Sequence, residues 1–305
     1  MDPNDTAYQD KLAAESKKWG EHLKVEASQE WNAWLDHPLI LGHYNERCMV
    51  EGLPWRKWLI KALSRPANRS LDLGCGTGSR SIVVFEEGAS KFVEGLDVSE
   101  ERIAGAEAFR RQKGIPGNFQ VADSNVAELP ENTYDLIFSC HSFHHFVALE
   151  HIMEQVHRAL TPSGVFILEE FVGPTQFQWT DRQMEIVRFL LSLIPKELRR
   201  FRWGDTKFAE GRPTPEEVVA VSPFESIRSG EIFPLFFEYF DVVAIKRLGG
   251  TIQHLLYNGI VHNFQSNERG AIQSLQAVWQ VEDALIDSDL LPSDFMLLVG
   301  RRRSD

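Results

Sequence analysis

Apolar residues near the start of the chain recur at spacings of three and four, which is the pattern of a helix with one buried face. This spacing is followed by Trp19, Leu23, Ala27, Trp31 and then Trp34 or Leu35. His37-Pro38 predicts the end of that helix, because a residue before proline avoids the helical conformation. Further helices are expected around 39–49 and after Pro54. We expect residues 1–64 to form helices that either cover a sheet or act as a lid over an active site.

Short apolar runs then alternate with amphipathic stretches. The expected strands are 69–73, 91–97, 118–122, 134–139 and 165–171. Thr77 or Ser79 is expected to cap the helix of residues 78–87, and Ser99 the next helix. The segment 161–164 reads as a turn before the fifth strand. Strands that alternate with helices predict a parallel sheet with both faces covered.

The alternation stops after residue 171. Residues 173–213 are aromatic and partly helical, helices are expected to begin near Pro213 and Pro223, and strands are expected at 240–247 and 295–300. This organisation predicts an α/β, doubly wound, seven-stranded core with a helical cap. Its expected parts are an N-terminal lid (1–64), a cofactor-binding core (65–172), a cap insertion (173–235) and the last core strands (236–305) with a helical insertion at 251–292.

Charge and cysteine usage narrow the class of protein. The 305 residues carry a formal charge of -12, which disfavours a nucleic-acid backbone as partner. Cys48, Cys75 and Cys140 form no C-x-x-C pair, as is typical of reduced thiols. No run approaches the ~18 apolar residues of a membrane span, and the N-terminus has no signal-peptide pattern. We expect a cytoplasmic protein without a transmembrane segment.

A glycine-rich turn joins the first strand to the first helix, in the segment Leu71-Asp72-Leu73-Gly74-Cys75-Gly76-Thr77-Gly78. Glycines at alternate positions let the backbone turn tightly and let a ligand lie against it. A dinucleotide-binding fingerprint has the spacing G-x-G-x-x-G, but here the third glycine comes one residue early and position 79 is Ser. A dehydrogenase is therefore disfavoured.

Polar residues follow the next strands at the edge where parallel sheets bind ligands. Asp97 ends the second strand, where its carboxylate can accept both hydroxyl groups of a ribose; a plain helix cap is the alternative. Val98 would offer an apolar face to adenine. Asp123 and Ser124 end the third strand. Asp97 and Val98 together predict an adenosine site.

Asp72, Gly74, Gly76 and Gly78 resemble motif I of the class I S-adenosylmethionine-dependent methyltransferases, an acidic residue followed by G-x-G-x-G. The segments 122–137 and 160–164 are also similar to that family, so the resemblance covers about 69–171. It implies S-adenosylmethionine as cofactor, S-adenosylhomocysteine as product, and a mostly parallel sheet with an antiparallel last strand. It also implies that Asp123 binds the adenine amino group and that His141 touches the methionine part. The full expected cofactor set is Asp72, Gly74, Cys75, Gly76, Gly78, Asp97, Val98, Asp123, Ser124, Cys140 and His141.

Three histidines, His141, His144 and His145, follow the fourth strand. We predict no metal site, because zinc favours separated ligand pairs and no cysteine or carboxylate has ligand spacing nearby. The resemblance implies a histidine pair at the wall between cofactor and acceptor. His145 or His144 can then act as a general base, since histidine titrates near neutral pH. Fixing the loop by hydrogen bonds is the alternative.

Glu169 and Glu170 end the fifth strand, and strand alternation points at most one of them to the pocket. We expect Glu170 to orient or deprotonate an acceptor hydroxyl or amine. The alternative is that both glutamates lie in a solvated loop and take no part in the reaction. Further acceptor-site candidates on the expected cap helix are Tyr257, Asn258, His262 and Asn263.

The expected function is in-line transfer of a methyl group from S-adenosylmethionine to a small-molecule acceptor, with oxygen or nitrogen favoured as the methylated atom. One alternative is a protein of the same fold with a regulatory role or other chemistry. Another is a protein or RNA methyltransferase, which is disfavoured because the family's asparagine-proline-proline-tyrosine signature is absent after the fourth strand. The sequence carries no signal for the oligomeric state.

Overall fold

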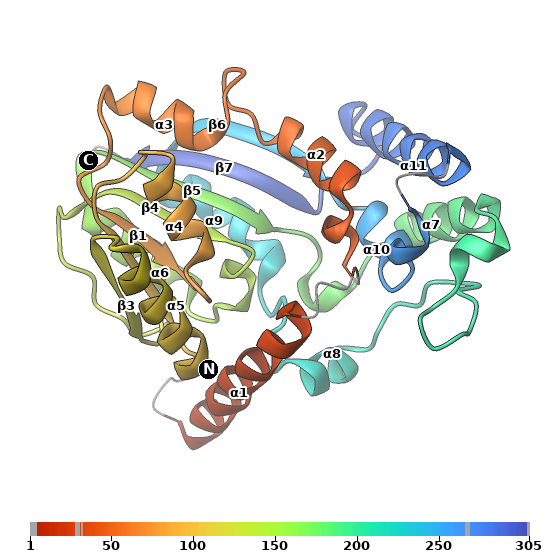
Figure 1. Ribbon diagram of the computed structural model, residues 1–305, viewed down its shortest axis with the longest axis horizontal. Helices are drawn as coiled ribbons and strands as arrows, with labels where there is room; N and C mark the ends of the chain where they lie inside the picture. The colour runs from red at the N-terminus through yellow and green to blue at the C-terminus, as the bar shows by residue number, and fades with distance from the viewer. Residues whose placement is uncertain (1–4, 28–30, 32, 266–268, 304–305) are drawn as a thin grey trace.

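A seven-stranded sheet runs through the centre of the computed structural model, which describes residues 5–27, 31, 33–265 and 269–303 (Figure 1). Its order is β3-β2-β1-β4-β5-β7-β6. The strands are β1 (Ser70–Leu73), β2 (Val93–Asp97), β3 (Gly117–Val121), β4 (Tyr134–Cys140), β5 (Leu160–Phe171), β6 (Phe240–Gly249) and β7 (Phe295–Arg302). The first five pair in parallel, and β7 pairs antiparallel with both β5 and β6. This confirms the predicted fold class and the antiparallel last strand.

Helices cover both faces of the sheet. The α-helices are α1 (Thr6–Ala27), α2 (Pro38–Arg47), α3 (Trp55–Leu63), α4 (Ser79–Glu86), α5 (Glu100–Lys113), α6 (Leu149–Ala159), α7 (Asp181–Leu193), α8 (Pro215–Val221), α9 (Ser229–Tyr239), α10 (Gln253–Tyr257) and α11 (Arg269–Asp287). Short 3₁₀ helices are η1 (Trp34–Asp36), η2 (Phe143–His145), η3 (Thr175–Phe177), η4 (Lys196–Arg199) and η5 (Val261–Asn263). In Figure 1, α7, α10 and α11 gather at one side of the molecule, beyond the end of the sheet nearest α2.

The two faces of the sheet have separate cores, as the alternation of strand side chains requires. On β4, Phe138 packs in the cluster that contains Trp55 and Leu59 of α3. Its neighbour Ile137 packs in the cluster that contains Val156 of α6 and residues of α9. Because both faces are buried, these strands read as continuous apolar runs.

Several local predictions are confirmed and others are wrong. The side chain of Ser99 caps α5 as predicted. Neither Thr77 nor Ser79 caps α4, whose N-cap is Gly78 in the left-handed conformation with no side-chain bond. The expected turn at 161–164 lies within β5, beside a register shift of its pairing with β4. The local sequence signals a break there, but the neighbouring strand keeps the segment paired.

The helical insertions differ most from the sequence prediction. α1 ends at Ala27 and Pro38 begins α2; residues 28–30 and 32, predicted to continue the first helix, lie outside the described residues. The helix expected from Pro223 begins instead at Ser229, after a bend that carries Glu225 inward. The helical insertion expected at 251–292 is divided into α10 and α11, and its residues 266–268 lie outside the described residues.

Candidate cofactor and acceptor site

A cavity of about 620 Å³ lies at the carboxyl ends of β1, β2 and β4 and beside the loop after β3. On its other side it is closed by α1 and by the loop before α9. Of the residues predicted to bind the cofactor, all except Gly78 line it: Asp72, Gly74, Cys75, Gly76, Asp97, Val98, Asp123, Ser124, Cys140 and His141. The topology therefore brings the predicted set together, since parallel strands end at one edge.

The glycine turn needs its first and last glycines for packing. Gly74 has φ +71°, and a Cβ there would lie 2.5 Å from the side chain of Ser142. Gly78 also has φ +71°, and its Cβ would lie 2.8 Å from the ring of Phe119. Both positions therefore exclude a side chain. Gly78 lets the start of α4 approach β3 and does not face the cavity.

Asp97 ties the glycine turn to the start of α5. Its Oδ2 accepts a hydrogen bond of 2.8 Å from the backbone N–H of Gly76, and its Oδ1 accepts one of 2.9 Å from that of Ser99. A carboxylate has about four acceptor positions, so two remain for hydroxyl donors from a ligand.

Asp123 is already bound by α1. The hydroxyl of Tyr8 donates to its Oδ2 at 2.7 Å, while Asn125 donates to its Oδ1 from both the backbone and the side chain. Tyr8 is fully buried, and burial together with Asp123 raises the pKa of its phenol. The N-terminal helix thus occupies an oxygen that was expected to meet the adenine amino group.

Asp72 lies at the base of the cavity, where the charge of Arg80 opposes the effect of burial but does not outweigh it. Its side chain is 2% exposed and accepts one hydrogen bond, of 2.7 Å, from the hydroxyl of Ser81. Burial raises the pKa of Asp72 to about 7, because one hydrogen bond does not replace the lost solvation of the charge.

Glu169 and Glu170 belong to different environments. Glu169 lies 3.5 Å from His141 Nε2 and 3.9 Å from Arg80, and these contacts lower its pKa to about 2 although burial opposes the shift. Glu170 accepts backbone N–H groups of the loop after β4 and lies 2.5 Å from Nδ1 of His144. Neither carboxylate lines the cavity. Glu170, which was expected to act on the acceptor, instead holds the histidine loop in place.

His145 lines the cavity, whereas His144 does not. Its Nδ1 lies 3.0 Å from Oε1 of Glu15 on α1, and the ring of Trp19 packs edge-on against it. Glu15 also accepts hydrogen bonds from the Trp19 indole and from Ser222. These contacts lower the pKa of Glu15 although it is buried. Sequence reasoning did not identify Glu15, because nothing local marks it as a partner of His145.

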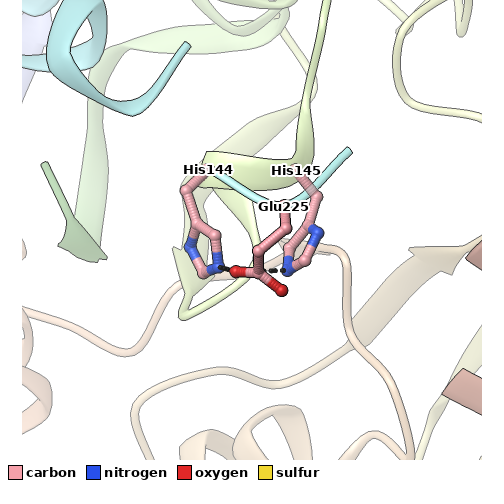
Figure 2. Close-up of side chains that lie close together, drawn as sticks. All are labelled: His144, His145 and Glu225. Atoms are coloured by element: carbon pink, nitrogen blue, oxygen red, sulfur yellow. Dashed lines mark ion pairs between the residues drawn. The ribbon is translucent and has the colours of Figure 1, made fainter. Parts of the chain in front are cut away.

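His144 is buried between two carboxylates. Its Nδ1 faces Glu170 and its Nε2 lies 3.4 Å from Glu225 Oε1. Burial alone would lower the pKa of His144, but the two glutamates raise it to about 10. His144, His145 and Glu225 form a compact group that offers three metal-ligand atoms (Figure 2).

An aromatic shell continues beyond His141. The His141 ring lies 6.1 Å from that of Tyr44 and 5.7 Å from that of Phe295, and Phe295 lies 5.6 Å from His254. A second cavity, of about 490 Å³, adjoins His254 and is lined also by Phe177, Trp179 and Asn258. The other sequence candidates on the cap, Tyr257, His262 and Asn263, line neither cavity. None of the helices in the described part of the chain has the length and apolar character to span a membrane.

Known proteins resemble part of this chain. A model of a methyltransferase domain matches residues 64–199. A demethylmenaquinone methyltransferase of Thermus thermophilus is 26% identical over 174 residues, which are 55% of this chain and 79% of that protein. Squalene methyltransferase 1 of Botryococcus braunii is 30% identical over 115 residues, 37% of this chain and 30% of that protein.

Two further matches are a protein named for a different activity and a solved structure of low sequence identity. The mitochondrial arginine-hydroxylase NDUFAF5 of Homo sapiens is 34% identical over 109 residues, 36% of this chain and 30% of that protein. A solved S-adenosylmethionine-dependent methyltransferase from Mesorhizobium loti is 19% identical, with a TM-score of 0.47, and the match covers 84% of this chain and 100% of that one. The chain thus spans less than a third of the squalene methyltransferase and of the hydroxylase that it matches.

Proposed function

Because the chain belongs to the class I S-adenosylmethionine-dependent methyltransferases, and S-adenosylmethionine is therefore its cofactor, we propose that it methylates a small, largely apolar acceptor at an oxygen or nitrogen atom. The observation that carries this proposal is the composition of the cavity. Carboxylates and glycines lie along its strand-end side, and His145 with aromatic residues lies on the other. Such a cavity suits a polar cofactor and a less polar acceptor side by side.

The cofactor would lie along the strand ends. We assign the ribose hydroxyls to the free acceptor positions of Asp97 and the adenine to the side of Val98. The carboxylate of Asp123 meets the adenine end, where Tyr8 must share or yield its oxygen. The glycine turn at 74–76 leaves the backbone accessible to the methionine part.

The chemical step is an in-line displacement. The acceptor's lone pair forms a bond to the methyl carbon while the bond from that carbon to sulfur breaks, and the neutral thioether S-adenosylhomocysteine leaves. A proton on the acceptor must leave at or before transfer. The protein mainly aligns the two molecules and excludes water, and such alignment can lower the barrier by ~7–11 kcal/mol. α1, which closes the cavity, is placed to exclude water.

Of the three residues predicted to be catalytic, His145 alone lines the cavity, so we assign to it the contact with the acceptor's reacting group. Glu15 positions this histidine through Nδ1, and Glu170 positions the loop that carries it. The aromatic residues that line the cavity, Trp19, Phe146 and Phe224, favour an apolar acceptor. The relatives named for demethylmenaquinone and squalene support an apolar acceptor; squalene, a hydrocarbon, offers only carbon for methylation, so these relatives do not bear on the choice of oxygen or nitrogen.

Two measurements test the proposal. Calorimetric titration with S-adenosylmethionine, S-adenosylhomocysteine and NAD should show binding of both adenosyl compounds and none of NAD. The protein should then be incubated with methyl-labelled cofactor and, separately, with panels of quinols, phenols, sterols and amines. The label should be transferred to an apolar compound in one of these panels. Binding of neither adenosyl compound would contradict the cofactor site. Transfer only to a protein or RNA would contradict the acceptor class.

A second function is favoured by one relative. NDUFAF5 is named an arginine-hydroxylase and is 34% identical to this chain over 109 residues. A fold of this kind therefore supports chemistry other than methyl transfer. Tight cofactor binding with no methyl transfer to any panel, but with oxygenation of an added acceptor, would favour this second function.

A further inference from the structure

Three side chains from two distant parts of the chain meet beside the acceptor end of the cavity (Figure 2). His144 and His145 belong to η2, directly after β4, and Glu225 lies in the loop between α8 and α9. Nε2 of His144 is 3.4 Å from Oε1 of Glu225, and Nε2 of His145 is 4.0 Å from the same oxygen. One potential ligand atom of each residue lies within 4.8 Å of the others.

We propose that His144, His145 and Glu225 bind a divalent transition-metal ion through two imidazole nitrogens and one carboxylate oxygen. Imidazole and carboxylate ligands lie ~2.0–2.2 Å from such ions, so two ligands of one ion stand roughly 3–3.5 Å apart. The His144–Glu225 separation of 3.4 Å is already in that range. The His145–Glu225 separation of 4.0 Å is longer, and a small rotation of the side chain would bring it into the range. Two histidines with one carboxylate are the ligand set of catalytic zinc and of non-haem iron(II) sites.

Each histidine has a second carboxylate on its other nitrogen. Nδ1 of His144 is 2.5 Å from Glu170, and Nδ1 of His145 is 3.0 Å from Glu15. Metal-binding histidines commonly donate their free N–H to a carboxylate, which sets the tautomer and the ring orientation. His144 makes such a hydrogen bond with Glu170, whereas Nδ1 of His145 lies near Glu15 without hydrogen-bond geometry. The arrangement directs both Nε2 atoms toward Glu225.

The carboxylates around His144 and His145 place negative charge there, and a cation would balance it. Glu15, Glu170 and Glu225 converge on two imidazoles, and Lys18 Nζ lies 3.5 Å from Oε2 of Glu225. Protons on the imidazoles can supply positive charge in the absence of a metal. A bound ion replaces those protons, since metal binding releases protons from its ligands. Lys18 contacts the oxygen of Glu225 that does not face the histidines, so it leaves Oε1 to the ion.

Three protein ligands leave coordination positions open, as in catalytic rather than structural sites. His145 lines the cavity, so these positions can take water or an oxygen of the acceptor. An ion there would occupy the lone pair that His145 needs as a general base, and would instead lower the pKa of the coordinated hydroxyl. The metal site does not rest on the proposed methyl transfer, because its ligands and their geometry are independent of the cofactor.

The test is metal binding by the purified full chain after removal of ions with a chelator. Titration with Co²⁺ followed by visible absorption, and with Zn²⁺ by competition, should show one ion per chain. Glu225→Gln, which keeps the shape of the side chain, should weaken binding by at least about tenfold, and His145→Ala should do the same. Glu238→Gln is the matched control, because Glu238 is exposed on α9 and does not belong to the group.

Circular dichroism and thermal unfolding of each variant report whether it is folded, independently of cofactor binding. Absence of a stoichiometric ion in the wild-type chain would overturn the metal site, and so would unchanged ion affinity in Glu225→Gln. If His145→Ala does not fold, Glu225→Gln still decides the question. Failure of the proposed function would appear separately, as absence of S-adenosylmethionine binding or of methyl transfer by a chain that does bind the ion.

Discussion

Two buried carboxylates line the same cavity from opposite sides, and their pKa values shift in opposite directions. Asp72, from β1, is 2% exposed, and burial raises its pKa to about 7. Glu15, from α1, is 3% exposed, but its pKa is lowered, because His145, Trp19 and Ser222 together outweigh the burial. Burial alone therefore does not decide the charge of a carboxylate; the donors around it do.

The two sides of the cavity therefore differ in how far their polar groups are already hydrogen-bonded within the protein. The strand-end wall consists of residues 72, 74–77, 79, 80, 97, 98 and 122–125. It holds hydrogen-bond acceptors, such as the carboxylate of Asp97, that still have room for ligand donors. The helical wall, made by α1 and by the loop with Phe224 and Glu225, is largely satisfied by contacts within the protein. We expect ligand affinity to depend mainly on the first wall, and stability and closure on the second.

The largest expected effect comes from Asp72→Asn, which removes the buried charge but keeps an oxygen for Ser81. A group whose folded pKa is raised favours the folded state below its unfolded pKa of ~4 and loses that contribution as pH rises to about 7. The variant should therefore match the wild type near pH 4 and exceed its free energy of unfolding at pH 8, by on the order of 4 kcal/mol. Urea denaturation at both pH values measures this. An equal difference at both pH values would show that Asp72 does not titrate in this range.

Asp97→Ala should have the next largest effect, on cofactor binding. The variant loses the ribose acceptor and also the tether between Gly76 and Ser99. Loss of hydrogen bonds to a charged group is worth ~3 kcal/mol, which is about a hundredfold in affinity for S-adenosylhomocysteine. Calorimetric titration measures it, with circular dichroism as the check of folding. Unchanged affinity would remove Asp97 from the proposed ribose site.

Much of the strand-end wall could be predicted because its signals are local. The apolar run before Asp72, the closely spaced glycines and the Ser99 cap are each visible within a few residues. The order of strands then follows from the alternation with helices and places Asp97 beside the glycine turn. Even here, the reason for Gly78 was not visible, since its contact with Phe119 crosses from one strand–helix unit to another.

The helical wall could not be predicted, because it is built from contacts between distant residues. Tyr8 reaches Asp123 across 115 positions, and Glu15 reaches Ser222 across 207. Glu225 was placed in a helix, whereas it lies in the loop before α9, and there it meets His144. The prediction of no metal site depended on the lack of a nearby carboxylate in sequence. The fold supplies one through tertiary contacts that helical periodicity does not report.

Glu15→Gln should weaken the helical wall with the opposite pH dependence to Asp72→Asn. A carboxylate whose folded pKa is lowered stabilises the protein above its unfolded pKa of ~4.5 and loses this contribution as pH falls. In chelator-containing buffer, the variant should be less stable than the wild type at pH 7 by about 2 kcal/mol, with the difference shrinking toward acid. Thermal unfolding at a series of pH values measures this. A loss that grows toward acid would contradict the assignment.

The smallest effect is expected for Tyr8→Phe, which removes one hydroxyl where the two walls meet. The variant loses the hydrogen bond to Asp123 but keeps the ring against Phe224, so stability should fall by only about 1 kcal/mol. The freed Oδ2 of Asp123 can then accept the adenine amino group without competition. Affinity for S-adenosylhomocysteine should stay the same or rise a few-fold, as titration of the variant beside the wild type will show. A large loss of affinity would instead mean that the Tyr8 hydroxyl itself binds the cofactor, and that α1 belongs to the ligand-binding wall.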